Sequence, residues 1–197
     1  MLLQLLLIGY VLAYIFKSEQ ALITVAVLAA MLVLSAWIAL NSITQQRLKL
    51  TAYALIAIAA GGLSNLLLVI FAVLNIDPWF SAQTVIPLAG MVFAASMNSV
   101  SLAAERFIAE LNHGVDENSA QNLALRAALI PVINSLFAVG LVSLPGMMTG
   151  QILSGVSPLI AARYQIIVMA MLFASSGVSA IVFLSMAKHA MMKNMTA

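Results

Sequence analysis

The sequence contains no cysteine and very few charged residues. Without cysteine the chain cannot form disulfides, thiolate metal sites or a cysteine nucleophile. Only 7% of its 197 residues are charged, whereas an average soluble domain carries roughly 25%. So few charges cannot cover the surface of a water-soluble globule, and 64% of the residues are hydrophobic. The composition therefore predicts a protein that is embedded in a lipid bilayer.

Several sequence patterns that carry chemistry are also missing. No phosphate loop of the form GxxxxGK[ST] is present, so the chain cannot hydrolyse ATP by that route. No histidine pair has helical spacing, and no carboxylate pair lies within an apolar stretch, which argues against an embedded enzyme and against an ion-coupled transporter. The net charge is only +2, without a basic cluster interleaved with aromatics. We therefore expect no enzymatic activity, no cofactor bound by this chain and no nucleic-acid partner.

The hydrophobic residues gather in six apolar stretches separated by polar breaks. The stretches cover residues 1–16, 20–42, 50–75, 82–104, 122–148 and 164–187. Each is close to the roughly 20 residues that cross a bilayer core of ~30 Å. Backbone amides in lipid must be satisfied within the chain, so each stretch should be an α-helix. The sequence predicts an all-α, polytopic membrane protein with about six transmembrane helices, which form a single transmembrane domain over residues 1–197.

The basic residues indicate how these helices would be oriented. Three of the polar breaks carry Lys or Arg that would share one side of the membrane: Arg47, Lys49, Arg106, Arg126 and Lys188. Because Lys and Arg concentrate in cytoplasmic loops, that side is predicted to be the cytoplasm. A multi-pass protein with a cytoplasmic C-terminus follows.

The largest polar segment, residues 105–126, lies in one of these breaks. Residues 101–111 keep apolar positions at helical spacing, Gly114 would end that helix, and Asp116 or Asn118 would cap the next one. This pattern predicts a cytoplasmic helix-turn-helix between spans four and five, which could lie against a partner protein. A solvated loop is the simpler alternative.

A second irregular region, residues 142–163, interrupts the apolar sequence. Pro145, Gly146 and Gly150 favour an irregular backbone, which survives at membrane depth only when it is buried or lines a cavity. The region is therefore a candidate gate, although Gly146 and Gly150 also form a GxxxG spacing that often serves only to pack helices. Met147 and Met148 lie at the same break, where a thioether could bind a soft metal ion.

Neutral polar residues remain inside the apolar stretches. Asn98 and Asn134 belong to spans joined by the predicted cytoplasmic turn, so both could face a shared pathway. The alternative is that each amide holds two helices together. Pro131 and Pro145 interrupt helical hydrogen bonding, and spans four and five are predicted to rock about them.

Two parts of the chain carry a resemblance to a known family. One runs through ALRAALIPVINS (124–135), VGLVSLPGMMTGQILSGVSP (139–158) and RYQIIVMAML (163–172), and the other is IPLAGMVFAASMNSVSLAAERF (86–107). On these segments the chain resembles the FetB family of bacterial ABC permeases, which is associated with iron export. Members of that family begin with a further helix, so the chain is expected to lack the family's first span. The family is also expected to carry an asparagine near position 95, where this chain has Ala95.

The resemblance implies a partner and a set of coupling residues. Residues 110–114 are similar to the ExxxG turn with which ABC permeases engage their ATPase. The residues assigned to ATPase coupling are Glu110, Gly114, Asp116, Glu117 and Arg126. By the same resemblance, a separate ABC ATPase subunit binds ATP and Mg, two permeases form a homodimer in the bacterial inner membrane, and the cargo is a metal ion such as iron.

Two other functions remain open at this point. An ATPase-independent channel or secondary transporter would transport its substrate without a partner subunit. A membrane enzyme or assembly factor is the third class, and the missing catalytic pair argues only against the enzyme.

Overall fold

The computed structural model describes residues 2–17, 20–41, 43 and 47–193, with side chains through Lys188. Nearly all of this part of the chain is helical, which confirms the predicted all-α class. The helices are α1 (Leu2–Ile15), α2 (Ala21–Ala39), α3 (Arg47–Ile58), α4 (Ser64–Leu68), α5 (Ala82–Asn112), α6 (Glu117–Ala138), α7 (Gly146–Leu153) and α8 (Pro158–Lys193), with π-helical segments η1 (Ala59–Leu63) and η2 (Val69–Val73).

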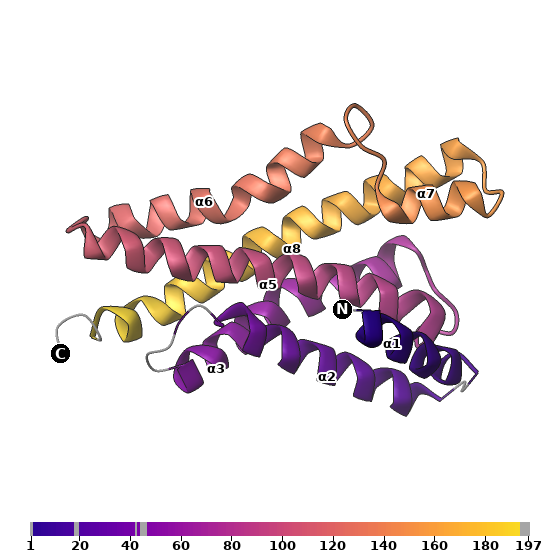
Figure 1. Ribbon diagram of the computed structural model, residues 1–197, viewed down its shortest axis with the longest axis horizontal. Coiled ribbons are helices and arrows are strands. Elements are labelled where there is room, and N and C mark those ends of the chain that lie inside the picture. Colours follow the sequence, from indigo (N-terminus) through magenta and orange to yellow (C-terminus); the bar gives the residue numbers. More distant parts are fainter. Residues whose placement is uncertain (1, 18–19, 42, 44–46, 194–197) are drawn as a thin grey trace.

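The long helices lie side by side as an elongated bundle (Figure 1). The end of α2, the start of α3, the turn from α5 to α6 and the end of α8 lie toward one end of the bundle. The start of α2, the segment before α5 and the segment around α7 lie toward the other end. The basic residues that predicted a common side of the membrane therefore belong to one end of the molecule, which we call the charged end.

Small residues allow the central helices to pack closely. Ala103 and Ala104 of α5 and Ala180 of α8 are fully buried, together with the aromatic side chains of Phe107 and Phe183. Helix α6 joins α5 through an alanine seam at four-residue spacing, formed by Ala120, Ala124 and Ala128. Close approach of helix backbones through small residues is the usual packing mode in lipid.

The third apolar stretch is not a regular α-helix. It runs from α3 through η1, α4 and η2, so two π-helical segments interrupt it. Within it, Asn65 Nδ2 donates to the Gly61 carbonyl oxygen at 2.7 Å. A side chain at Gly61 would collide with α8, because an added Cβ would lie 2.7 Å from the Ser175 carbonyl oxygen and 2.7 Å from the Ser179 amide nitrogen. Only glycine permits this contact.

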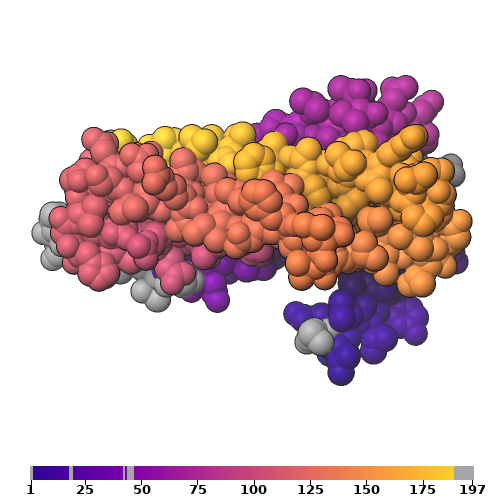
Figure 2. All heavy atoms as spheres, turned by 90° about the horizontal axis from the view of Figure 1, so that it is seen from above, coloured from indigo at the N-terminus to yellow at the C-terminus, as the bar shows by residue number. Residues whose placement is uncertain are grey.

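Four helical segments of the described chain are long and apolar enough to cross a membrane. They are Ala21–Ala39, Arg47–Val73, Ala82–Asn112 and Pro158–Lys188. Helix α1 is apolar but only 14 residues long, and it projects from the body of the molecule (Figure 2). Helix α6 has 22 residues but begins with polar turns. The count of six spans stays a prediction.

Two boundaries differ from the sequence expectation. The fifth apolar stretch was predicted to reach residue 148, but α6 ends at Ala138 and the backbone turns at Gly140, whose φ is +80°. Hydrophobicity continues through this turn although the helix does not. The sixth apolar stretch was given as residues 164–187, but the helix that contains it, α8, begins at Pro158 and continues to Lys193.

Candidate functional site

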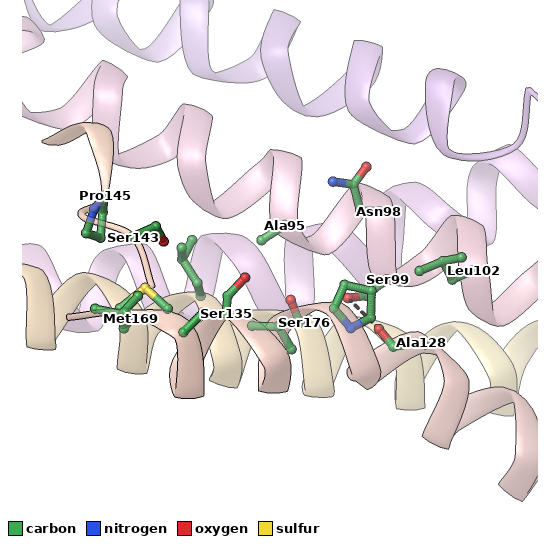
Figure 3. A pocket seen from close by; sticks show the side chains of 15 residues that line it. Ala95, Asn98, Ser99, Leu102, Ala128, Ser135, Ser143, Pro145, Met169 and Ser176 are labelled. Atoms are coloured by element: carbon green, nitrogen blue, oxygen red, sulfur yellow. Dashed lines mark hydrogen bonds between the residues drawn. The ribbon is translucent and has the colours of Figure 1, made fainter. Parts of the chain in front are cut away.

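A cavity of about 360 Å³ lies between α5, α6 and α8 (Figure 3). Its walls come from α5, from α6 and the turn that follows it, and from the middle of α8. The lining residues are Ala95, Asn98, Ser99, Leu102, Ala128, Pro131, Val132, Ser135, Ala138, Val139, Ser143, Pro145, Met169, Leu172 and Ser176. None of these residues is ionisable, so the polarity of the cavity comes from hydroxyl groups, one amide and the backbone.

The serines of the cavity differ in how well their hydroxyls are satisfied. Ser99 Oγ donates to the Ala128 carbonyl oxygen at 3.4 Å, which links α5 to α6. Ser176 is 1% exposed, and its Oγ has no hydrogen-bond partner in the described part of the chain. Figure 3 shows Ser135 and Ser176, from α6 and α8, close together at this space. A buried hydroxyl that faces a cavity without a protein partner is suited to bind water or a ligand.

The structure brings together three of the predicted pathway residues. Asn98, Pro131 and Pro145 line the cavity, as does Ala95, the position where the family resemblance leads us to expect asparagine. Asn98 lies at the edge, with its side chain turned away from Ser99 (Figure 3). Asn134 is exposed and is not among the lining residues. Asn134 is therefore not part of this cavity.

The other predicted gate residues lie beyond this cavity. Gly146 and Gly150 belong to α7, and among the described atoms nothing lies within 4 Å of a Cβ added at either position. Their GxxxG spacing therefore packs against no helix within the described chain. Pro145 precedes α7 at its N-cap position with extended backbone, as its fixed φ allows. The irregular segment is thus a turn followed by a short helix.

Three serines that line the cavity, Ser99, Ser143 and Ser176, were not predicted from the sequence. Serine is common in membrane helices, and its position in the sequence does not reveal which face of the helix it occupies. A signal was available for Ser99, because it follows Asn98 in the same span. Predicting that Ser176 lines the cavity would require knowing how α8 is rotated against α5 and α6, and the sequence periodicity does not determine that rotation.

The two methionines that were predicted to form a soft metal site face different spaces. Met147 lines a cavity with the beginning of α5, whereas Met148 lines another with the end of α6. Among the described residues, no group of three or more His, Asp or Glu side chains could hold a metal ion. A metal site formed by this pair of methionines stays a prediction without geometric support.

The turn between α5 and α6 has the local features expected from its residues. Helix α5 ends at Asn112, and Gly114 adopts a φ of +79°, which glycine tolerates best. Asp116 is the N-cap of α6, with its side-chain oxygen accepting the Ser119 backbone N–H at 3.0 Å, so the predicted cap is confirmed. This backbone hydrogen bond, reinforced by one to the Ser119 side chain, lowers the pKa of the exposed Asp116 carboxylate below its ordinary value near 3.8.

Two ion pairs organise the charged end. Glu110 is almost buried near the end of α5 and pairs with Arg106, one turn earlier. Glu117 at the start of α6 pairs with Lys188 of α8, with an N–O distance of 3.2 Å. Four of the predicted coupling residues, Glu110, Gly114, Asp116 and Glu117, therefore lie in or beside one turn. Arg126 is exposed on α6, more than two helical turns further along.

Comparison with known proteins found a matching family and several relatives over nearly the whole chain. The family described as "Uncharacterised protein family (UPF0014)" matches residues 1–121 and 117–192. A UPF0014 membrane protein of Synechocystis sp. is 35% identical, with 91% of this chain and 75% of the relative covered. The "Probable iron export permease protein FetB" of Escherichia coli is 36% identical, with 91% and 73% covered.

More distant relatives include a plant protein. "Protein ALUMINUM SENSITIVE 3" of Arabidopsis thaliana is 31% identical, with 91% of this chain and 70% of the relative covered. No solved structure matches significantly. The resemblance to the FetB family, which residues 86–107 and the segments within 124–172 carried, is thereby confirmed. The chain belongs to the UPF0014 family of membrane proteins.

Proposed function

We propose that this chain is the permease subunit of an ABC-type exporter and that a separate ATPase subunit powers it. One observation carries the proposal. The two helices that form most of the cavity, α5 and α6, are joined by the polar turn at residues 113–116. A partner that displaces this turn would move two walls of the cavity together.

Because one turn joins two walls of the cavity, the proposed mechanism is alternating access. Closure of an ATPase dimer, which binds ATP and Mg, would push on the turn and tilt α5 and α6 against α8. Pro131 lies inside α6, where it interrupts helical hydrogen bonding, and Pro145 lies at the N-cap of α7, after the turn that follows α6; these two positions would provide the hinges. The cavity would open alternately to the two ends of the bundle, with Asn98 and the serines contacting the cargo.

The remaining assignments complete this proposal. Residues 1–197 form one permease domain in a bacterial inner membrane, with about six spans, a cytoplasmic charged end and a cytoplasmic C-terminus. Two permeases would act as a homodimer with two ATPase subunits, and the chain itself would carry out no chemistry. Iron enters as the proposed cargo because a relative with 36% identity is named a probable iron export permease.

Docking of the ATPase is tested by co-purification. The chain is co-expressed with a candidate phosphate-loop ATPase subunit, and the permease is captured through a tag. We expect Glu110→Ala, Gly114→Val and Asp116→Ala to reduce the ATPase recovered, while Ser157→Ala, near the opposite end of α8, leaves it unchanged. If all three variants retain full pairing, the turn is not the docking element.

The orientation of the chain in the membrane is tested by cysteine labelling. Because the natural sequence has no cysteine, an introduced cysteine is the only thiol that the reagent can label. An Asp116→Cys variant in intact cells should resist a membrane-impermeant maleimide and should react after the inner membrane is opened. A matched Ser157→Cys variant should react in intact cells whose outer membrane is permeabilised. Labelling of the first variant from the periplasm would place the turn outside and end the docking proposal.

A channel or secondary transporter is the competing function. It predicts cargo movement by the reconstituted chain alone. The proposed exporter predicts movement only when the ATPase subunit and ATP are both present. Metal flux measured in proteoliposomes with and without the ATPase therefore decides between the two.

A further inference from the structure

Helix α6 has an inner and an outer face. The inner face carries the buried alanines Ala120, Ala124 and Ala128, through which α6 joins α5. The outer face is not covered by another helix, because α6 lies open along the side of the molecule seen in Figure 2. In a bilayer this outer face would meet lipid tails, which offer no hydrogen-bond partner to a polar side chain.

One polar side chain, Asn134, lies on this outer face. It is exposed and makes no hydrogen bond within the described part of the chain. The hydrogen bond from Ser99 to the Ala128 carbonyl oxygen places this part of α6 alongside the membrane-length helix α5. Asn134 follows Arg126 of the charged end by eight residues, or about 12 Å along the helix, and so lies near the middle of a hydrocarbon core of ~30 Å. An unpaired amide at that depth is unfavourable, so Asn134 requires a partner from outside this chain.

The residues around Asn134 form a regular stripe, which we call the outer seam. It consists of Leu123, Ala127, Ile130, Asn134 and Phe137, which follow one another at alternating spacings of four and three residues. Their side chains share one face of α6, and Leu123, Ile130 and Phe137 are 39%, 54% and 73% exposed. A repeat that averages 3.5 residues is the spacing with which two helices pack along their length in a coiled coil.

A second copy of the chain fits this seam. Two copies inserted in the same orientation are related by a twofold axis along the membrane normal, so their α6 helices run parallel. In a parallel pair each seam residue meets its own counterpart, and Asn134 meets Asn134. The amide side chain carries both donors and an acceptor, so the two asparagines satisfy each other. A single asparagine in an apolar seam of this spacing also fixes the register of the two helices.

We propose that the outer seam of α6 is the contact between two copies of this chain, with the paired Asn134 side chains at its centre. The inference rests on the proposed function, which calls for a homodimer, and it assigns the helix and the residues that form the contact. Asn134 thereby joins two helices, but helices of different chains. Pro131 and Ser135, which line the central cavity and are exposed, lie beside the seam, so the second copy would border that cavity.

Disulfide cross-linking of the full chain in isolated membranes tests the contact. Ile130→Cys places the only thiol in the seam, whereas Ile181→Cys places it on α8 at a position of similar exposure, 51% against 54%. Oxidation by copper phenanthroline should yield several times more dimer from Ile130→Cys, because a disulfide requires Cα atoms within ~7 Å. A seam covered by lipid would give no dimer from Ile130→Cys. That result, or equal dimer from both variants, overturns the proposal.

The role of the amide is measured separately, by energy transfer between labelled copies in liposomes at increasing lipid dilution. Asn134→Leu keeps a side chain of similar size and suits a lipid-facing position, so the single copy should fold. Its dimer dissociation constant should rise about threefold to thirtyfold, the range expected for the loss of one interhelical hydrogen bond in a membrane. Asn134→Gln, which keeps an amide, should restore most of the affinity. An unchanged dissociation constant in Asn134→Leu contradicts the pairing of the two asparagines.

The outer seam and the proposed function can fail independently. Both measurements use the permease chain alone, whereas docking of the ATPase is read from co-purification. ATPase pairing without cross-linking of Ile130→Cys overturns the seam and leaves the ABC assignment intact. Cross-linking of Ile130→Cys without ATPase pairing supports the seam and overturns the ABC assignment.

Discussion

The two sides of the bundle are built differently. On one side, α3 and η1 pack against α5 and α8 so closely that Gly61 has no room for a side chain. On the other side, α6 buries only three alanines and α7 buries none of its residues, and the cavity between α5, α6 and α8 borders this side. The close-packed side leaves no space beside Gly61, whereas the side that carries α6 and α7 leaves a cavity between its helices.

The largest expected effect comes from filling the close-packed side. Gly61→Ala should lower the free energy of unfolding by about 1–3 kcal/mol or more, because the new Cβ meets backbone atoms of Ser175 and Ser179 that cannot rotate away. Thermal unfolding in detergent measures this loss. Gly177→Ala, on α8 and with nothing near its added Cβ, should be neutral or stabilising. Equal melting temperatures for the two variants would remove the contrast between the sides.

A second effect of similar kind is expected at the turn that joins α5 and α6. Gly114→Val should cost about 1–2 kcal/mol, because a β-branched residue is strained at a φ of +79°. Gly114→Asn, which tolerates left-handed backbone, should cost less. Melting temperatures of the two variants check the order. A smaller loss for valine than for asparagine would show that the turn does not keep this conformation.

Composition and hydropathy were enough to predict the helical class and most helix positions. The start of α5 at Ala82 and the cap at Asp116 agree with the sequence prediction, since both depend on local residues. The end of α6 at Ala138 was not predicted, because the apolar residues continue through the turn that follows. Hydropathy measures preference for lipid, and it does not detect where a backbone changes direction.

The cavity was only partly predictable. Asn98, Pro131 and Pro145 were identified because polar and helix-breaking residues stand out in an apolar sequence. Ser176 and Ser99 were missed because a lining position depends on how three helices are rotated against one another. The same limit applies to Met147, which was paired with Met148 because the two are neighbours in sequence, although they line different cavities in the structure.

A smaller effect is expected at the contact between α6 and α8. Lys188→Ala should cost about 0.2–1 kcal/mol, as expected for a partly exposed ion pair. The exchange of both charges, Lys188→Glu with Glu117→Lys, should recover part of the loss, and added salt should reduce the difference between wild type and Lys188→Ala. Absence of recovery in the double variant would show that the pair does not hold α6 against α8.

Ser176→Ala should separate stability from transport. The Ser176 hydroxyl is buried and unpartnered, so its removal should leave the melting temperature unchanged or slightly raised. Transport by the reconstituted complex should fall if this hydroxyl contacts cargo in the central cavity. Ser185→Ala, which removes an exposed hydroxyl bonded within its own helix, is the control. A clear loss of stability in Ser176→Ala would mean that the cavity is part of the packed core.

The smallest effect concerns the pH dependence of the turn. The Ser119 hydrogen bonds lower the pKa of Asp116 in the folded chain, so the charged carboxylate stabilises the fold at pH values above the unfolded pKa of ~3.9. That stabilisation is lost as the pH falls through the lowered pKa, because the unfolded state binds the proton first. Asp116→Asn keeps a capping oxygen but does not titrate, so its melting temperature should lie below that of the wild type at pH 7. The gap between the two should close toward pH 3. A gap that stays constant over this range would show that the Asp116 charge makes no contribution to the α6 cap, and that only its hydrogen-bond geometry matters.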